Sequence, residues 1–372
     1  MKKSFADILV QVNSAKEKKI ARKLPSWARV PGLEFPYELS LEQCSSEEAA
    51  RHKLSILEPY LQRDNVSVCD LTCGMGVDSW AFSQRAAKVI SYERDSTLAA
   101  ATASNFHRLG ADNIEVRNAE VGPQTLLPEC DIIFADPARR DNIGKKVFLL
   151  EDCSPDIRSL LPQMKEKAAV ILLKLSPMAD ISLIADQLGS GLKEMHIVSV
   201  GGEVKELLCL IERGFEGQYR ICVEEAGQEG TFSFYPEEES ACRAHHADSI
   251  NVGEFLHEPS AALLKSGAFK LATERFGIEK LDTSTHLYKG GAEMQSSLFK
   301  TFRIEEVLEF SSSSLKELKR RRIKADVTAR NLEISSDELR KKIAALPGGH
   351  LHIFACPGCG RRLLLICSRC TA

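Results

Sequence analysis

The chain has 372 residues, of which 44% are hydrophobic, and carries a formal net charge of −3. This length and apolar content allow a large buried core and more than one domain. The nearly balanced charge excludes a protein-wide basic field, so any surface for nucleic acid has to be local. No segment approaches the roughly 18–20 apolar residues of a membrane span, and the first residues resemble an amphipathic helix rather than a signal peptide. We therefore expect a cytoplasmic protein without a membrane partner.

Residues 1–217 predict a helical start followed by an α/β domain. Residues 1–60 predict helices that are separated by Pro25, Pro31 and Pro36. Over residues 61–217, short apolar runs from 66-VSVCDL-71 to 206-ELLCLIE-212 alternate with helical patterns. Such alternation predicts βαβ units in a Rossmann-like, mostly parallel sheet. The last two runs are too close together for a helical crossover, which predicts an antiparallel hairpin at the end of the sheet.

The pattern changes after residue 217, where a polar linker leads to a smaller α+β region. The segment 258-EPSAALLKSGAFKLATERFG-277 predicts a helix with Pro259 near its start and Gly277 just past its end. A strand-rich tail begins at about Phe302 and contains the basic stretch 315-LKELKRRRIKADVTAR-330.

Two glycines follow the first predicted strand in the segment 70-DLTCGMG-76 and raise the question of what the turn binds. A dinucleotide fingerprint needs a third glycine where this chain has Ser79, and no Gly-Lys-Ser/Thr follows for a P-loop. The segment instead resembles the cofactor turn of class I methyltransferases, particularly the Asp-Pro-Phe-Cys-Gly-Ser-Gly type of nucleic-acid base methyltransferases. This resemblance implies that S-adenosylmethionine is bound by five residues of the turn: Asp70, Thr72, Cys73, Gly74 and Gly76. Asp70 would meet the ammonium group, directly or through water. Asp78 either approaches the cofactor or caps the next helix, and we favour the cap.

The ends of the next two predicted strands supply further candidates for the cofactor site. Glu93 and Arg94 follow the second strand, and a carboxylate at Glu93 suits the two ribose hydroxyls because it accepts from both at once. The third strand ends in 116-VRNAE-120. By the same resemblance, Asn118 or Glu120 binds the adenine amine, and Ala119 lies against the ring.

The fourth predicted strand ends in 131-DIIFADPARRD-141 and carries the candidate catalytic residues Asp136, Pro137 and Arg139. The segment resembles the Asp/Asn-Pro-Pro-aromatic motif that orients a target amino group towards the methyl donor. Ala138 replaces the second proline, and Arg139 replaces the aromatic residue. A pyrimidine-C5 reaction needs a nucleophilic cysteine in a later strand, and the fifth predicted strand, 170-VILLKLSP-177, has none. Cys153 is the nearest candidate, but its surroundings resemble the start of a helix, so we favour an amine or ring nitrogen as the target.

A basic rim follows this motif, formed by Arg139, Arg140, Lys145 and Lys146, and it suits a polyanionic substrate. Lys174, on the fifth strand, either joins this rim or pairs with an acidic residue, and the sequence leaves both open.

The C-terminal part resembles an uncharacterised bacterial group that joins a class I methyltransferase domain to a ferredoxin-like piece and a THUMP-like domain. The resemblance is carried by 258-EPSAALLKSGAF-269, by 329-ARNLEISSDELRKKI-343 and by the glycine pair near 348. The resemblance covers the chain from about Glu47 onward. Together with the helical pattern over 1–60, it predicts a methyltransferase domain over 61–217, a linker with a small ferredoxin-like or helical region over 218–300, and a THUMP-like RNA-binding domain over 301–372. Since THUMP domains bind RNA, tRNA or rRNA is the expected partner, with contacts from Lys319, Arg320, Arg321 and Arg322.

Two Cys-x-x-Cys pairs close the chain, at Cys356 and Cys359 and at Cys367 and Cys370. Four such thiolates typically bind zinc, and a hairpin would have to bring the two pairs together. Members of the resembling group do not depend on these cysteines, so we expect no metal and keep the four as the alternative zinc ligands. The whole sequence predicts an S-adenosylmethionine-dependent methyltransferase that acts on a nucleic-acid base. A methyltransferase for proteins or small molecules, or a non-catalytic RNA-binding protein, are the alternatives.

Overall fold

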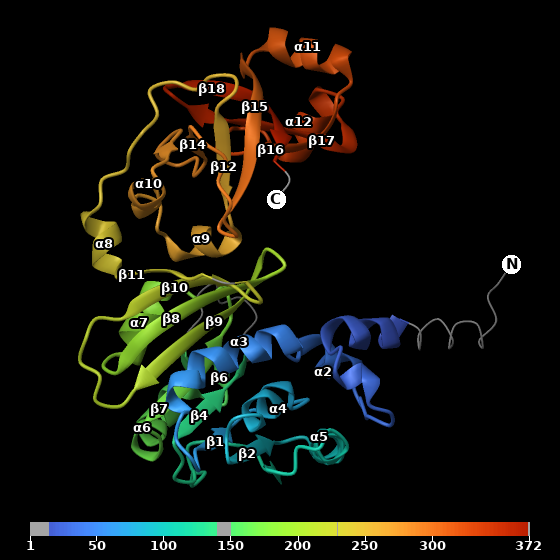
Figure 1. Ribbon diagram of the computed structural model, residues 1–372, viewed down its shortest axis with the longest axis vertical. Coiled ribbons are helices and arrows are strands. Elements are labelled where there is room, and N and C mark those ends of the chain that lie inside the picture. The colour runs from blue at the N-terminus through green and yellow to red at the C-terminus, as the bar shows by residue number, and fades with distance from the viewer. Residues whose placement is uncertain (1–14, 140–149, 229, 371–372) are drawn as a thin grey trace, which may run out of the picture. The chain divides into compact units, whose positions relative to one another are not determined.

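The computed structural model describes residues 15–139, 150–228 and 230–370. The chain divides into two compact units, residues 1–200 with 205–222 and residues 201–204 with 223–372. Along the colour scale of Figure 1, the first unit runs from blue to green and the second mostly from yellow to red. Residues 15–23 are helical, whereas the rest of the expected N-terminal helix lies outside the described residues. Within the described part of the chain, no helix combines the length and apolar character needed to cross a membrane.

The first unit alternates helices and strands after a helical start, as the apolar periodicity predicts. Its helices are η1 (Trp27–Arg29), α2 (Glu38–Gln43), α3 (Glu47–Leu57), η2 (Glu58–Tyr60), α4 (Val77–Ser83), α5 (Ser96–Arg108), η3 (Leu150–Asp152), α6 (Ile157–Lys167) and α7 (Ile181–Leu188). Its strands are β1 (Ser67–Asp70), β2 (Lys88–Glu93), β3 (Ile114–Asn118), β4 (Ile132–Ala135), β5 (Ala138–Arg139), β6 (Cys153–Ser154), β7 (Val170–Leu175), β8 (Leu192–Val200), β9 (Glu203–Glu212) and the start of β10 (Arg220–Glu225).

The main sheet has the strand order β11-β10-β8-β9-β7-β4-β1-β2-β3, with β11 formed by Phe232–Phe234. Strands β3, β2, β1, β4 and β7 are parallel, while β9 runs antiparallel to β7. The two-residue link between the neighbouring strands β8 and β9 confirms the expected hairpin. Its expected place at the end of the sheet is wrong, because β10 and β11 extend the sheet beyond β8. From β1 the chain first adds strands on one side and then on the other, so the carboxyl ends of β1 and β4 flank a topological switch point. Open α/β sheets bind their ligands at such points.

Burial and caps explain why these segments form a stable sheet with helices. Strand β4 is buried along its whole length, and only Lys174 of β7 is partly exposed. Strands of this kind need cover on both faces, which the βαβ connections supply. Aspartates cap three of the connecting helices: Asp95 accepts from the Leu98 amide, Asp156 from the Ser159 amide and Asp180 from the Leu183 amide.

The second unit is built on a seven-stranded sheet with the order β13-β14-β12-β15-β18-β17-β16. Its strands are β12 (Phe255–Pro259), β13 (Glu279–Lys280), β14 (Tyr288–Gly290), β15 (Phe299–Glu309), β16 (Lys324–Ala329), β17 (Leu346–Gly358) and β18 (Arg361–Arg369). Its helices are α8 (Pro236–Ala241), α9 (Ala261–Ser266), α10 (Leu271–Phe276), α11 (Ser312–Arg321) and α12 (Ser336–Lys342). Along β18, Leu363 and Leu365 belong to one buried cluster, and Leu364 and Ile366 belong to another. The alternation shows that this strand contributes to the core on both of its faces.

The prediction of a single helix between residues 258 and 277 is wrong. Glu258 and Pro259 lie in β12, and the remainder forms two short helices, α9 and α10. The break falls at Gly267, which ends α9 with φ of +77°. Glycine adopts this left-handed conformation without the penalty that a β-carbon imposes.

Candidate active site

A cavity of about 240 Å³ lies where the strands around the switch point end. Its wall includes the turn from Leu71 to Asp78, the β2 end from Tyr92 to Arg94, the segment from Ala119 to Val121, and Asp136. The structure therefore brings nine predicted cofactor residues to one cavity, namely Thr72, Cys73, Gly74, Gly76, Glu93, Arg94, Ala119, Glu120 and Asp136. All of them lie in the first unit.

The two glycines of the turn have different physical roles. Gly76 has φ of +79°, and a β-carbon there would lie 2.3 Å from Phe106 Cζ and 2.7 Å from Thr102 Cγ2. Gly74 has φ of +57°, but its β-carbon would meet only the Thr72 carbonyl oxygen, at 4.0 Å. Gly76 is therefore required by packing beneath the turn, whereas the space at Gly74 is open towards the cavity.

Glu93 is held rigidly at the cavity wall by backbone amides. The Gly74 amide donates to Glu93 Oε2 at 2.9 Å, and the Asp95 amide donates to Oε1 at 2.8 Å. Because each carboxylate oxygen can accept more than one hydrogen bond, both retain acceptor capacity for a ligand in the cavity.

Asp70 lies beneath the turn and is not part of the cavity wall. Its Oδ1 accepts from the Thr72 amide at 2.9 Å, and its Oδ2 accepts from the Ser79 hydroxyl at 2.5 Å. Burial raises the pKa of Asp70 to about 7, although the hydrogen bonds from Ser79 and Thr72 oppose that shift. These contacts indicate that Asp70 shapes the turn from below.

At the end of β3, Asn118 likewise supports the site from outside the cavity. Its side-chain amide donates to the carbonyl oxygens of Glu93 and Arg94, at 2.9 and 3.1 Å. Ala119 and Glu120 do line the cavity, and Glu120 forms an exposed ion pair with Arg94 at 3.6 Å. Of the two candidates for the adenine amine, Glu120 is the one that faces the cavity.

The motif after β4 reaches the cavity through Asp136 and Ala138. The Asp136 amide donates to Thr72 Oγ1 at 2.6 Å, which ties the end of β4 to the glycine turn. Pro137 adjoins Asp136 but is not part of the wall, and Arg139 forms the short strand β5 with β6. The rest of the predicted rim, Arg140, Lys145 and Lys146, lies outside the described residues.

An alternating chain of acids and lysines connects the two ends of the cavity wall. Lys53 Nζ lies 3.1 Å from Asp78 Oδ1 and 2.7 Å from Glu206 Oε1. Lys174 Nζ lies 3.8 Å from Glu206 Oε1 and 2.5 Å from Asp136 Oδ2. The order of these side chains is Asp78, Lys53, Glu206, Lys174, Asp136, and the Lys53 side chain is fully buried.

This arrangement settles two expectations about the charged residues. The predicted helix cap at Asp78 is wrong, because Gly76 holds the N-cap position and Asp78 instead accepts from the Ser45 hydroxyl at 2.7 Å. Lys174 pairs with acids, which was one of its two open interpretations. Burial lowers the pKa of Lys174, but the carboxylates of Asp136, Glu206 and Asp78 outweigh burial and raise it overall.

Sequence reasoning missed one side of the cavity. Ser40, Gln43, Cys44 and Ser45 come from α2 and the turn after it, and they contribute to the wall. No motif marks these residues, because α2 is short and contacts the site only through the tertiary fold. The helical region before β1 therefore contributes to the site through these four residues.

In the second unit, the predicted RNA contacts lie at the end of α11. Lys319, Arg320 and Arg322 are exposed, while Arg321 forms an ion pair with Glu306. This ion pair offsets the positive charge of one of the four predicted RNA-contact residues.

The C-terminal cysteines lie on the hairpin of β17 and β18, which does not bring the two pairs together. Its register pairs Cys356 with Leu363 and Cys367 with His352. Cys359 lies in the turn, whereas Cys370 follows the far end of β18. An antiparallel register of this kind keeps the two pairs apart along the strands.

The fold has a close counterpart among solved structures. The crystal structure of a "putative methyltransferase" from Porphyromonas gingivalis W83 is 31% identical, with the match covering 96% of this chain and 89% of that chain at a TM-score of 0.85. The chain belongs to this class I methyltransferase family. Within it, residues 255–295 match a family model described as a ferredoxin-like domain, and residues 299–369 match one described as THUMP domain-like. The boundaries predicted from the sequence between the domains stay a prediction.

Other likenesses cover less of this methyltransferase-family chain. A "putative RNA methyltransferase" from Pyrococcus horikoshii is 19% identical over 41% of this chain and 72% of that one, with a TM-score of 0.31. Magnesium protoporphyrin IX methyltransferase from Synechocystis PCC 6803, solved with bound S-adenosylmethionine, is 12% identical over 54% of this chain and 96% of that one, with a TM-score of 0.37. A search of curated proteins found no match.

Proposed function

We propose that this protein transfers a methyl group from S-adenosylmethionine to a nucleic-acid base in RNA, either tRNA or rRNA. The observation that carries the proposal is the convergence of the glycine turn, Glu93 and Asp136 on one cavity at the switch point. The family's fold supports methyl transfer, and the THUMP-like match supports RNA as the substrate.

The cavity residues fit S-adenosylmethionine. Gly74 leaves open space where a side chain would otherwise stand, and Glu93 presents a carboxylate fixed by two amides. These residues would hold the cofactor's ribose against the turn, with Glu120 on the adenine side. When bound, the cofactor supplies a methyl group that is activated by a positively charged sulfonium.

The residues of the chain would mainly position the acceptor. Asp136 is about one-third exposed and is held by Lys174, so its carboxylate is kept in place at the cavity wall. It would accept a hydrogen bond from the target amino group and turn the nitrogen lone pair towards the donor. Orientation of this kind lowers a barrier by several kcal/mol when the reacting atoms are held in line.

RNA is favoured over other substrates by the second unit. Lys319, Arg320 and Arg322 place exposed positive charge on a domain that resembles THUMP domains, in a chain whose net charge is −3. Contacts from such residues to phosphates give affinity without reading a sequence.

The activity is tested by mass spectrometry of nucleosides from total RNA, compared between cells with and without the gene. We expect one methylated nucleoside to disappear without the gene and to remain absent when only an Asp136→Ala variant is supplied. An unchanged nucleoside profile would contradict RNA as the substrate, and full restoration by Asp136→Ala would contradict the role of that residue.

The cofactor site is tested by titration calorimetry with S-adenosylmethionine. Glu93→Ala removes the proposed hydrogen bonds to the ribose, and hydrogen bonds to charged groups contribute roughly 1.5–3 kcal/mol each. We expect affinity to fall by about 100-fold or more. Glu115→Ala is the matched control, because Glu115 is exposed on the neighbouring strand and pairs with Arg117 and Lys88 away from the cavity. Equal affinity of the two variants would refute the ribose assignment.

A further inference from the structure

A second cluster of reactive side chains lies on the strands that follow the parallel part of the main sheet. Glu194 and His196 are two residues apart on β8, and Arg220 and Cys222 are two residues apart on β10. Residues spaced by two along a strand share a face, and β8 and β10 are neighbours in the sheet. The fold therefore brings a carboxylate, an imidazole and a thiol together from two adjacent strands.

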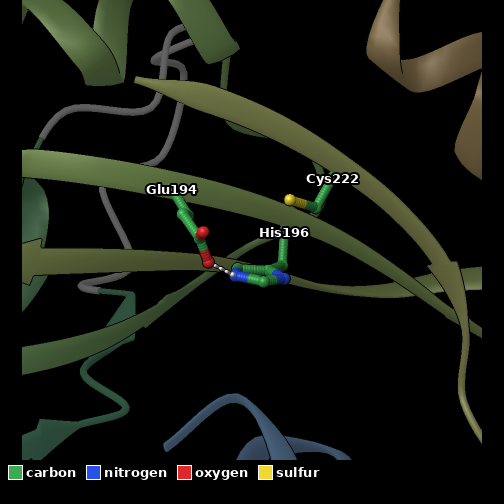
Figure 2. Close-up of side chains that lie close together, drawn as sticks. All are labelled: Glu194, His196 and Cys222. Carbon is green, nitrogen blue, oxygen red and sulfur yellow. Dashed lines mark hydrogen bonds and ion pairs between the residues drawn. The ribbon is translucent and has the colours of Figure 1, made fainter. Parts of the chain in front are cut away.

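The ligand atoms of these three side chains converge. The carboxylate oxygen, the ring nitrogen and the sulfur all lie within 4.8 Å of one another, and His196 Nε2 is 3.0 Å from Glu194 Oε2. Figure 2 shows Glu194 and His196 joined on one strand, with the Cys222 sulfur pointing towards the same space. His196 is 5% exposed and Cys222 is 2% exposed. Over the described ranges, this is the one group of His, Cys, Asp and Glu side chains that converges in this way.

We propose that Glu194, His196 and Cys222 bind a zinc ion. Zinc takes thiolate, imidazole and carboxylate ligands at about 2.0–2.3 Å. Ligand atoms of a tetrahedral site at those bond lengths lie roughly 3–4 Å apart, so small side-chain rotations bring the three atoms into place. Three protein ligands leave the fourth position to a water molecule.

The surroundings of the cluster hold the Glu194 carboxylate in position for a bound cation. Arg220 lies 2.5 Å from Glu194 Oε1, which leaves Oε2 directed at His196. A ligating carboxylate is commonly held through its second oxygen by a partner of this kind. Binding releases the proton of the Cys222 thiol, and the resulting thiolate and the Glu194 carboxylate face the two charges of the ion and the single charge of Arg220, which leaves one net positive charge.

The consequence of this site is a link between β8 and β10. A zinc ion that binds only the folded state stabilises it in proportion to the logarithm of its concentration over the dissociation constant. The site is separate from the methyl-transfer cavity, because none of the three ligands belongs to that cavity's wall.

The test uses the full-length chain, freed of metal with a chelator and then titrated with Co²⁺ as a spectroscopic probe and with Zn²⁺ as its competitor. We expect one ion per chain, visible d–d absorption, and the charge-transfer band of a cobalt–thiolate bond. Cys222→Ser should remove that band and weaken zinc binding by about 100-fold or more, since even supporting partners of a metal ligand contribute 10–100-fold.

Two further variants keep the result interpretable. His196→Asn should also weaken zinc binding, and circular dichroism of each metal-free variant establishes that it is folded. A Cys359→Ser, Cys370→Ser double variant should bind as the parent does, because these thiols lie on the hairpin of the second unit. Absence of stoichiometric binding, a cobalt–thiolate band that survives in Cys222→Ser, or a band that disappears in the double variant would each overturn the proposal.

Discussion

Replacing Lys53 with methionine should destabilise the first unit more than removal of an exposed charge on the same helix. The Lys53 ammonium is fully buried and has three partners: Glu206 at 2.7 Å, Asp78 at 3.1 Å and the Ser45 hydroxyl at 3.0 Å. Methionine keeps much of the apolar stem but removes the nearest cation from two largely buried carboxylates. Glu206 is left with Lys174 at 3.8 Å, and Asp78 is left with the Ser45 hydroxyl. Breaking a buried ion pair from one side costs about 3–5 kcal/mol, because the remaining charge is uncompensated.

The chain offers both a local reporter and a matched control for this measurement. Its two tryptophans, Trp27 and Trp80, lie in the first unit with ring centroids 5.9 Å apart, so tryptophan fluorescence during urea unfolding reports on this unit. Arg51→Met removes an exposed cation from the same helix, where it pairs with Glu47 four residues away. Glu47 is buried but keeps its hydrogen bonds from Ser26 and the Trp27 amide, so loss of the exposed Arg51 cation should cost less than about 1 kcal/mol.

The comparison of the two variants decides the argument. We expect the free energy of unfolding to fall by about 3–5 kcal/mol in Lys53→Met and by less than 1 kcal/mol in Arg51→Met. Adding Glu206→Gln to Lys53→Met should recover part of the loss, since one of the two stranded charges is then removed. Equal losses in Lys53→Met and Arg51→Met would refute the view that Lys53 holds the acids of the cavity wall in place.

Two more predictions concern the glycine turn and the acid beneath it. Gly76→Ala should destabilise the first unit by about 1–3 kcal/mol, because its β-carbon would overlap Phe106. Gly74→Ala should lose less stability but bind S-adenosylmethionine weakly. Urea unfolding and titration calorimetry of both variants check this, and equal losses of stability would contradict it. The pKa of Asp70 rises from 3.8 to about 7 on folding. Between these pH values the folded state keeps a proton that the unfolded state has lost. The free energy of unfolding therefore falls with rising pH, by up to roughly 4 kcal/mol from this group. Asp70→Asn should flatten that dependence in urea titrations between pH 4 and 7, and an unchanged slope would show that another group causes it.

The sequence predicted the cavity residues that follow strands because strand order brings them to one edge. Glu93, Glu120 and Asp136 stand at the ends of three apolar runs, and parallel strands place such ends at the same side of the sheet. The same rule could not predict which of the residues at the strand ends face the cavity and which support it from outside. Asp70 and Asn118 also end strands, β1 and β3, but their side chains turn away from the cavity to backbone and side-chain partners, a choice that depends on the rotamers and packing of the folded turn.

Partners far apart in sequence explain the other misses. Lys53 and Glu206 are separated by 153 residues, so the ion pair that links them has no local pattern. Asp78 stands where a helix begins, and the local rule predicts a cap, but the buried Lys53 attracts its carboxylate instead. The error at Gly267 has a local cause. The glycine itself indicated the end of a helix, but the apolar periodicity across it was given more weight.

The alternating acids and lysines, from Asp78 through Lys53, Glu206 and Lys174 to Asp136, give the cavity wall a net negative charge. Lys174 holds Asp136 while Lys53 holds Asp78, and both lysines share Glu206. Three acids and two lysines leave one net negative charge, with acids at both ends of the chain on the cavity wall. A site that binds a positively charged sulfonium nucleoside benefits from that excess, because attraction between opposite charges is stronger where water is partly excluded. The lysines thus keep the carboxylates fixed without cancelling their combined charge.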